Sequence, residues 1–398
     1  INGLSGNSIR YFLDGMPLDT KGSGVSLANL PVNIIDRIEI YKGVVPASLG
    51  TDALGGAINI ITKQEKKNYL DVSYGIGSFH THKADLNAQF VEPKTGLIIR
   101  PTVGVNYSKN DYRMKDVQMR DESGDNFIYG NPKRFHDDYF SLLGQIEIGV
   151  ANKSWADAFF VSASYSKTDK ELQTGAVQTK VYGMAERNSD AWNISAHYQK
   201  RNFILKNMQL NAALSQTWDH SLTVDTTYRK YYWDGGYIDG QRNEIMGKER
   251  SMRHYKRPLT VVRANLDYKL NNHHNFNLNY HLSRTGNDRY DDLDTTFEPS
   301  NDVVSKHILG FSYNQSLLEG KMENVFFIKD YINHPNIRQT DQPSVTGSEA
   351  VQGSTTKNYL GYGVGLRYTV AEALAVKVSY EHSVRLPIAR ELLGNGTN

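Results

Sequence analysis

A long series of alternating apolar and polar residues constrains this chain most strongly, and it runs from about residue 68 to residue 386. Residues 276–282 read Phe-Asn-Leu-Asn-Tyr-His-Leu, and residues 360–370 place an apolar or tyrosine side chain at every second position. Because side chains alternate between the two faces of a β-strand, each segment predicts a strand with one apolar and one polar face. A soluble β-sandwich has such strands too, so one segment alone does not decide the fold class.

The connections between the segments separate the two possibilities, because they alternate between short and long. Short connections are predicted at residues 92–96, 151–154, 201–202, 271–274, 319–321 and 371–373. Long connections are predicted at residues 110–134, 169–186, 220–253, 286–303 and 330–353, and the first hairpin, at 77–82, is short where the alternation predicts a long loop. Tight turns at one end and long loops at the other are typical of transmembrane β-barrels. Loops of this length are uncommon in soluble β-proteins.

The composition is compatible with this architecture. Apolar residues make up 39% of the 398 residues, the mean hydropathy is −0.54, and no apolar run approaches the ~18 residues of a membrane helix. The 25 tyrosines, 14 phenylalanines and 4 tryptophans would supply aromatic girdles, although a tyrosine-rich soluble β-protein would have the same composition. The chain has no cysteine, which excludes a disulfide framework and a thiolate metal site and suits an oxidising periplasmic side. A formal charge of +2 is too small to indicate a partner.

Residues 34–62 have a different texture, with two strands rich in isoleucine around a small-residue turn region at 43–56. Four ordered motifs carry a resemblance to the second half of the plug domain of TonB-dependent outer-membrane receptors. They are Phe12-Leu13-Asp14-Gly15-Met16-Pro17, Ile35-Asp36-Arg37-Ile38-Glu39-Ile40, residues 43–50, and Gly55-Gly56-Ala57-Ile58-Asn59-Ile60-Ile61-Thr62-Lys63. The sequence departs from the family pattern at Tyr41-Lys42, at Val44-Val45 before the proline, and at Leu49.

The resemblance implies a mainly β fold, in which a small α+β plug domain fills the lumen of a transmembrane antiparallel β-barrel. Residues 1–65 would be the C-terminal half of the plug, and residues 66–398 the N-terminal part of the barrel. The pattern gives about 13 strands, whereas complete barrels of the family have 22. An open barrel would leave two unpaired edges in lipid. We therefore expect a truncated chain that lacks the front of the plug and roughly the last third of the barrel.

The function that the resemblance implies is energised import of a scarce, bulky nutrient across the bacterial outer membrane. A ferric siderophore, cobalamin or haem would be the ligand, and the TonB–ExbB–ExbD complex and membrane lipid would be the partners, with no nucleic acid, cofactor or resident metal. A TonB-dependent glycan or peptide importer and a passive porin-like or adhesin barrel are the alternatives. An outer-membrane enzyme is disfavoured, because the sequence contains no Gly-x-Ser-x-Gly, His-Glu-x-x-His or phosphate-binding loop.

Two regions are candidates for ligand binding. By resemblance, one is the apex of the plug, with small polar residues that supply directional hydrogen bonds: Asn7, Ser8, Asp19, Thr20, Lys21, Ser23 and Ser26. The other is the predicted outer loop, which combines aromatic and cationic side chains: Tyr228, Arg229, Tyr231, Tyr232, Trp233 and Tyr237. Aromatic faces next to cations suit a flat or anionic ligand. The same rings could instead pack the loop or belong to the outer girdle.

Charged residues suggest further roles. Arg37 and Glu39 interrupt an apolar plug strand, so we expect them to pair with charges on the barrel wall and latch the plug; an ordinary charged surface strand is the alternative. The acidic run of Asp288, Asp291, Asp292 and Asp294 could hold Ca²⁺, although it lacks EF-hand spacing and fits a solvated loop. His80 and His82 could form a metal pair on one strand face but fit exposed polar residues better, and His273 and His274 are predicted to be solvated.

Overall fold

The computed structural model describes residues 8–18, 34–42, 45, 49, 52, 56–62, 67–120, 126–337, 353–354, 356–372 and 374–387. Most of these residues lie in β-strands, as the alternation predicts. Within these ranges there is no helix with the length and apolar character needed to cross a bilayer. Six of the seven candidate residues at the plug apex lie outside the described residues: Asn7, Asp19, Thr20, Lys21, Ser23 and Ser26.

The plug motifs form one small sheet. Its strands are β1 (Ile9–Leu13), β2 (Met16–Leu18), β3 (Ile35–Lys42) and β4 (Gly56–Thr62), in the spatial order β2-β1-β4-β3. The β1–β2 turn is an Asp14-Gly15 pair with φ values of 48° and 77°, the left-handed conformation that a two-residue hairpin turn requires. The Asp14 carboxylate accepts hydrogen bonds from the backbone nitrogen and the hydroxyl of Thr62, at 2.9 and 2.7 Å. The turn is therefore tied to the end of β4.

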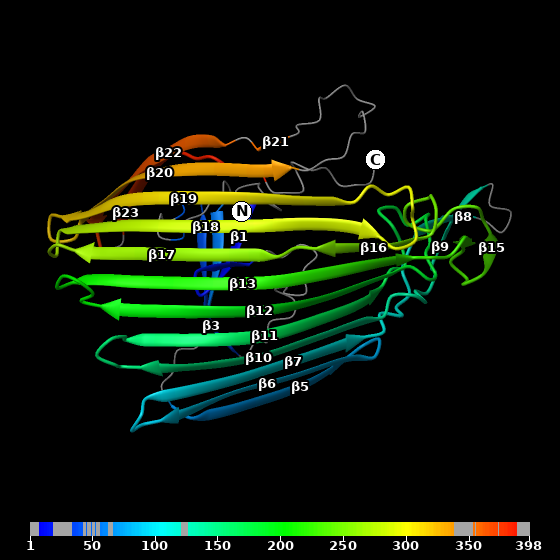
Figure 1. Cartoon of the computed structure of the whole chain (residues 1–398), viewed down its shortest axis with the longest axis horizontal. Coiled ribbons are helices and arrows are strands. Elements are labelled where there is room, and N and C mark those ends of the chain that lie inside the picture. The colour runs from blue at the N-terminus through cyan, green and yellow to red at the C-terminus, as the bar shows by residue number, and fades with distance from the viewer. Residues whose placement is uncertain are drawn as a thin grey trace.

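The alternating segments form the barrel wall, an antiparallel sheet of 15 strands whose hydrogen-bonded path has 13 members. The strands are β5 (Tyr69–Gly77), β6 (Thr81–Glu92), β7 (Leu97–Ser108), β10 (Tyr139–Ala151), β11 (Ala158–Glu171), β12 (Glu186–Arg201), β13 (Met208–Asp225), β16 (Ser251–Lys256), β17 (Leu259–Lys269), β18 (His274–Asp291), β19 (Ser300–Leu317), β20 (Met322–Ile337), β21 (Gly353–Ser354), β22 (Lys357–Ala371) and β23 (Leu374–His382). The strands β16 and β17 occupy one place between β13 and β18 (Figure 1). The two-residue strand β21 also lies off the path, beside the end of β20. The path of 13 strands therefore agrees with the roughly 13 strands that the sequence predicts.

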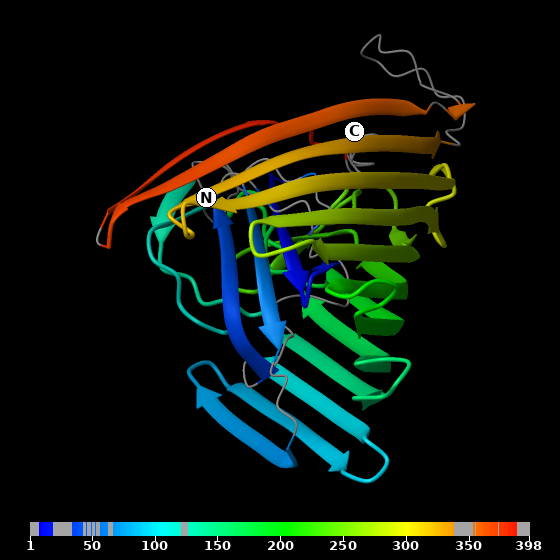
Figure 2. The same cartoon turned by 90° about the vertical axis from the view of Figure 1, so that its left-hand side faces the viewer.

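The wall curves around the plug, which lies on its concave side (Figure 2). The convex face is apolar: Trp192 and Trp218 sit opposite each other on β12 and β13, and each is at least half exposed. The tilted ring of Tyr165 contacts Trp192 near the long-loop end, and Phe276, Tyr313 and Phe326 form a second aromatic group near the short turns. Two aromatic groups on an apolar outer face are what a bilayer with two interfaces requires.

Several of the outer loops predicted from the sequence are too long, because the strands that flank them extend further than predicted. The strand β13 continues to Asp225, β18 continues to Asp291, β19 begins at Ser300, and β20 runs to Ile337. In these stretches the ladder hydrogen bonds continue although the apolar alternation has ended, as between Arg289 and Ser300. A strand that has left the hydrocarbon layer no longer needs an apolar outer face, so its sequence resembles that of a loop.

Candidate functional site

One buried carboxylate joins the plug to the barrel wall. Asp52 is 6% exposed, and it accepts hydrogen bonds from Nε and Nη2 of Arg10, at 3.0 and 3.1 Å, within the plug. From the wall, Nζ of Lys306 on β19 lies 3.8 Å from the carboxylate, and the backbone nitrogen of Leu386 donates to it at 3.1 Å. Burial alone would raise the pKa of Asp52, but Arg10 and Lys306 hold this pKa below its ordinary value. Asp52 therefore acts as an anionic bridge between the two parts.

Two further cations of the wall contact backbone carbonyls of the plug. Nη1 of Arg263 on β17 donates to the carbonyl oxygen of Gly15 at 2.7 Å, and Nζ of Lys329 on β20 donates to that of Val45 at 3.4 Å. A Cβ atom at Gly15 would lie 2.1 Å from Nη1 of Arg263, so the close approach needs a glycine as well as a positive φ. Lys329 is also paired with Glu381 on β23 at 3.3 Å. The plug is thus held from β17, β19 and β20.

Arg37 and Glu39 make their ion pairs within β3 instead of with the wall. Arg37 is more than half exposed and donates to Asp36 at 3.0 Å and to Glu39 at 2.9 Å. Glu39 also accepts from the hydroxyl of Tyr41 and from Nδ2 of Asn59. Within the described part of the chain, the plug-to-wall ion pair runs through Asp52, and the latch role of Arg37 and Glu39 stays a prediction. Both residues face the cavity described next.

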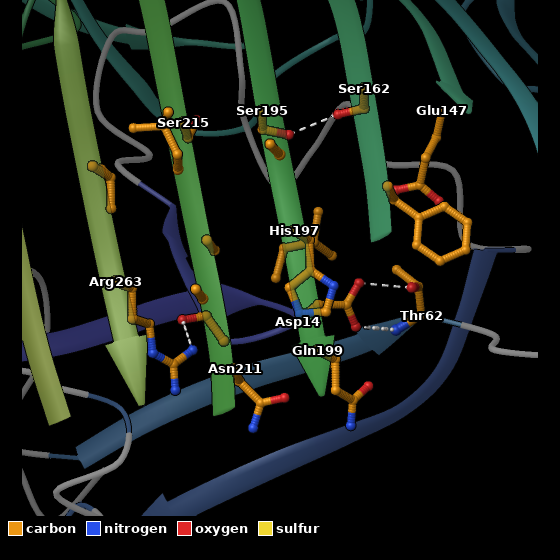
Figure 3. A pocket seen from close by; sticks show the side chains of 18 of the residues that line it. Asp14, Thr62, Glu147, Ser162, Ser195, His197, Gln199, Asn211, Ser215 and Arg263 are labelled. Carbon is orange, nitrogen blue, oxygen red and sulfur yellow. Dashed lines mark hydrogen bonds between the residues drawn. The ribbon is translucent and has the colours of Figure 1, made fainter. Parts of the chain in front are cut away.

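A cavity of about 1020 Å³ separates the plug from one part of the wall. Its plug side is formed by β3, β4 and the Asp14-Gly15 turn, and its wall side by β7, β10 to β13 and β17 (Figure 3). Short polar side chains dominate the wall on β11 to β13: Ser162, Ser164, Asn193, Ser195, Gln199, Asn211, Ser215 and Thr217. Arg100 and Glu147, paired at 2.6 Å, line it on β7 and β10. This is a polar, hydrogen-bonding surface inside the barrel.

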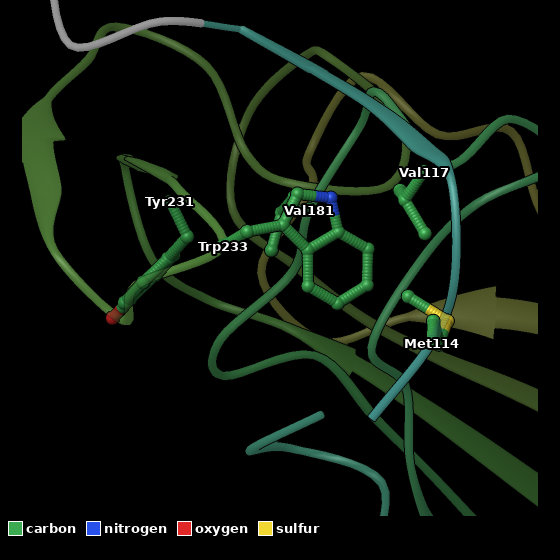
Figure 4. Packing of buried hydrophobic residues seen from close by; sticks show 5 residues of the cluster. All are labelled: Met114, Val117, Val181, Tyr231 and Trp233. Atoms are coloured by element: carbon green, nitrogen blue, oxygen red, sulfur yellow. The ribbon is translucent and has the colours of Figure 1, made fainter. Parts of the chain in front are cut away.

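The outer loops share a hydrophobic core, which includes two of the candidate ligand residues. Trp233 and Tyr231 pack with Val181, Met114 and Val117, which come from two other loops (Figure 4). Nε1 of Trp233 donates to the carbonyl oxygen of Gln178 at 3.0 Å. This bond ties the loop of residues 226–250 to the loop of residues 172–185. Two of the three loops also carry a strand pair of their own: β8 (Val117–Arg120) with β9 (Phe127–Gly130), and β14 (Arg229–Tyr231) with β15 (Tyr237–Asp239). Burial favours the packing role for Tyr231 and Trp233.

The other loop candidates remain accessible. Tyr237 is 48% exposed, and the guanidinium of Arg229 lies 4.0 Å from the centre of its ring. Tyr232 is partly exposed and has Nζ of Lys230 at 5.9 Å. The hydroxyl of Tyr228 is bonded to the carboxylate of Glu249. Ser8 of the plug apex is described and partly buried. Arg229 with Tyr237 is the most open aromatic–cation pair that the structure forms from the predicted set.

The acidic run is neutralised by an arginine and by backbone donors. Asp291 accepts hydrogen bonds from Ser251, from Nε of Arg253 at 3.2 Å and from the backbone nitrogen of Asp294 at 2.9 Å. Asp294 accepts from Nη2 of Arg253 at 3.3 Å. These donors occupy the carboxylate oxygens that calcium would need. Among the described residues there is no group of three or more side chains arranged to hold a metal ion.

The histidines that the sequence singled out also have protein partners. His80 lies in the β5–β6 turn with a φ of 55°, so it does not share a strand face with His82, which contacts the Tyr74 hydroxyl at 2.7 Å. His273 and His274 contact the Ser316 carbonyl and the Tyr313 hydroxyl, which joins two neighbouring short turns. These contacts favour structural roles.

His136, in the loop before β10, gives a pH-dependent prediction. Its ring contacts Glu171 at 3.4 Å and the Ala185 carbonyl at 2.9 Å. Burial lowers the pKa of His136, but Glu171 outweighs burial and raises it above the ordinary value. A raised pKa stabilises the folded loop fully below about pH 6.5, and the contribution is lost as the pH rises through the folded pKa. We expect the hydrogen-exchange protection factors of residues 134–138, which are corrected for the intrinsic base-catalysed rate, to fall from pH 6 to pH 9, and His136→Gln to abolish that fall. An unchanged pH profile in the variant would contradict the prediction.

Comparisons with known proteins agree with the fold and the motifs. Residues 1–57 match the family described as TonB-dependent Receptor Plug Domain. The chain is 25% identical over 276 residues to the vitamin B12 transporter BtuB of Vibrio vulnificus (strain CMCP6), which covers 63% of this chain and 43% of the transporter.

Solved structures resemble the whole chain. The copper transporter OprC superposes with a TM-score of 0.73 at 11% identity, over 98% of this chain and 56% of that protein. The FrpB iron transporter from Neisseria meningitidis (F5-1 variant) superposes with a TM-score of 0.68 at 13% identity, over 98% of this chain and 58% of that protein. The chain thus spans about half the length of the proteins it resembles. The plug match, the sequence relatives and the plugged wall together place the chain in the family of TonB-dependent outer-membrane receptors.

Proposed function

We propose that this receptor imports a scarce, bulky nutrient across the outer membrane with energy supplied through TonB. The observation that carries the proposal is the plug inside the wall, fixed by the buried bridge of Asp52 with Arg10, Lys306 and Leu386. A passive channel has no use for a folded domain anchored in its lumen. Removing such a domain means separating buried charges, which is costly and requires work from outside the barrel. The TonB–ExbB–ExbD complex is the partner that would supply this work.

The proposed cargo is a ferric siderophore, cobalamin or haem. The vitamin B12 transporter is a sequence relative, and the iron transporter has the same fold, which supports this range of ligands for the present chain without choosing between them. The exposed Arg229–Tyr237 pair would meet the cargo first, because it lies in the outer loops. The family consists of transporters and receptors, and no catalytic role is proposed.

The test uses the full-length receptor. We would measure equilibrium binding of ferric siderophores, cobalamin, haem and oligosaccharides in detergent, and then uptake by cells with and without a proton uncoupler. We expect saturable, sub-micromolar binding of one iron chelate or of cobalamin, and uptake that the uncoupler abolishes. Uncoupler-insensitive uptake together with ion conductance in a planar bilayer would point to a passive channel instead. Preferential binding of an oligosaccharide would favour the glycan importer.

Replacing Tyr237 with alanine is expected to weaken cargo binding about tenfold. The change removes the ring and its cation–π contact with Arg229, which at an exposed site is worth roughly 0.5–1 kcal/mol, together with the contact area of the ring itself. The control is Tyr74→Ala, which removes a similarly exposed tyrosine from the outward face of β5. Receptor amounts should match in both variants. Equal affinities for the two would exclude Tyr237 from the binding surface.

A further inference from the structure

The short turn between β12 and β13, residues 202–207, exposes three consecutive apolar side chains. Phe203 is 40% exposed, Ile204 74% and Leu205 49%. Each of the other short turns in the described part of the chain exposes one large apolar side chain at most. These turns gather at the end of the wall opposite the shared core of the outer loops (Figure 1). A run of three exposed apolar residues is unfavourable in water and indicates a surface that another apolar medium covers.

The neighbouring turn between β10 and β11, residues 152–157, is bonded to the base of this turn. The hydroxyl of Tyr198 on β12 donates to the carbonyl oxygen of Trp155 at 2.7 Å, and Nζ of Lys200 donates to that of Ser154, also at 2.7 Å. Trp155 is itself 51% exposed. Both turns have wall strands on either side of them, so they lie away from the two edges of the sheet. The two turns therefore form one unit that exposes aromatic and aliphatic side chains.

This unit continues the outward face of the wall. Phe160 lines the internal cavity, so its neighbour Phe159 on β11 faces outward. The ring of Trp155 meets the ring of Phe159 edge-on, with the ring centres 5.6 Å apart. Tyr198 lies opposite Phe159 in the register of β11 and β12, on the same outward face. Tryptophan and tyrosine gather at the level of lipid headgroups, so these rings mark the membrane interface on the side of the short turns.

Lysines flank the apolar run. Lys200 follows Tyr198 at the next outward position of β12, and its ammonium lies at the adjoining turn. Lys206 comes directly after Leu205 and is exposed. Apolar side chains bordered by lysines are the combination that enters a lipid interface, because the apolar groups reach the acyl chains while the ammonium groups attract anionic headgroups.

We infer that the turns of residues 152–157 and 202–207 form a lipid anchor, in which the apolar run inserts into the phospholipid leaflet on the periplasmic side and Lys206 contacts a headgroup phosphate. A periplasmic protein could also cover an apolar turn, but the continuity with the lipid-facing rings and the flanking lysines favour phospholipid. The anchor goes beyond the proposed import function and does not depend on the cargo. Because the other described short turns have no such run, it would hold the barrel in the membrane from the side of β10 to β13.

The test places a nitroxide label on the turn of the full-length receptor. The chain has no cysteine, so Ile204→Cys gives one site once any cysteine elsewhere in the receptor is replaced by serine. The matched control is Asn272→Cys, at an exposed position of the short turn between β17 and β18. In phosphatidylcholine vesicles we would measure the collision rates of each label with oxygen, which concentrates in lipid, and with a neutral, water-soluble nickel chelate. Melting temperatures in detergent should match the parent receptor.

We expect the ratio of oxygen to nickel collisions to be roughly fivefold or more higher at position 204 than at position 272, because only the first label lies in lipid. Adding phosphatidylglycerol should lower the nickel collision rate at position 204 further, and Lys206→Glu should abolish that decrease. Equal ratios at the two positions would overturn the anchor. A label at position 204 that is exposed to water in vesicles but cross-links to a periplasmic protein in cells would assign the turn to a protein partner. Insertion that does not respond to phosphatidylglycerol would overturn the contact between Lys206 and phosphate.

Discussion

Replacing Asp52 with alanine is expected to release the plug from the wall and to cost the folded receptor about 3–5 kcal/mol, the usual effect of removing one partner from a buried ion pair. The change leaves the charges of Arg10 and Lys306 facing each other without the anion, and it leaves the backbone nitrogen of Leu386 without its acceptor. The full-length variant should have a lower melting temperature. It should also admit a bulky antibiotic that the intact receptor excludes.

The control for this prediction is Asp36→Ala, which removes an exposed carboxylate of β3 from its pair with Arg37. An exposed ion pair contributes little, so this variant should lie within about 0.5 kcal/mol of the parent and should not leak. The double variant Arg37→Ala, Glu39→Ala tests the latch expected from the sequence, and we expect it to leak less than Asp52→Ala. Leakage from the double variant alone would move the lock to β3 and contradict the role given to Asp52.

Replacing Trp233 with alanine should detach three outer loops from one another. Removing a buried tryptophan costs roughly 3–5 kcal/mol, and here the loss falls on a cluster that joins Trp233 to Val181, Met114 and Val117. External protease should cleave the loops of intact cells at least ten times faster, and amide exchange there should accelerate, while the melting temperature of the barrel changes little. Ile238→Ala, at a half-exposed position of the same loop, should behave like the parent receptor. Equal protease resistance of the two variants would show that the loops hold without Trp233.

The strand alternation was sufficient to predict the wall, because the lipid outside and the hydrated lumen inside impose opposite polarity on neighbouring residues of every strand. That constraint ends where the strands leave the membrane. Arg289 and Ser300 are hydrogen-bonded strand residues, yet nothing in their sequence context distinguishes them from loop residues. Periodicity therefore could not predict the ends of β13, β18, β19 and β20 that lie next to the long loops. It did predict the short turns and the order of the strands.

The contacts of the plug were harder to predict, since they join residues that are far apart in the chain. Leu386 lies 334 positions after Asp52, and no local pattern links the two. A weak signal existed: Asp52 is the only acidic residue in the turn region of residues 43–56. Arg37 and Glu39 were predicted to pair with the wall because they interrupt an apolar strand. In the structure their charges are paired within that strand. For the aromatic loop, composition could not separate the buried Trp233 from the exposed Tyr237, because only tertiary packing does so.

The shared core of the outer loops determines how the receptor is seen from outside the cell. Since Val117, Val181 and Trp233 from three separate loops pack into one body, an antibody or a phage tail protein meets a composite surface whose shape depends on all three segments. Serum raised against a synthetic peptide copied from one loop should bind the denatured chain well and intact cells poorly. Escape variants need not lie where the binder makes contact, because a change in the buried tryptophan would alter the entire epitope.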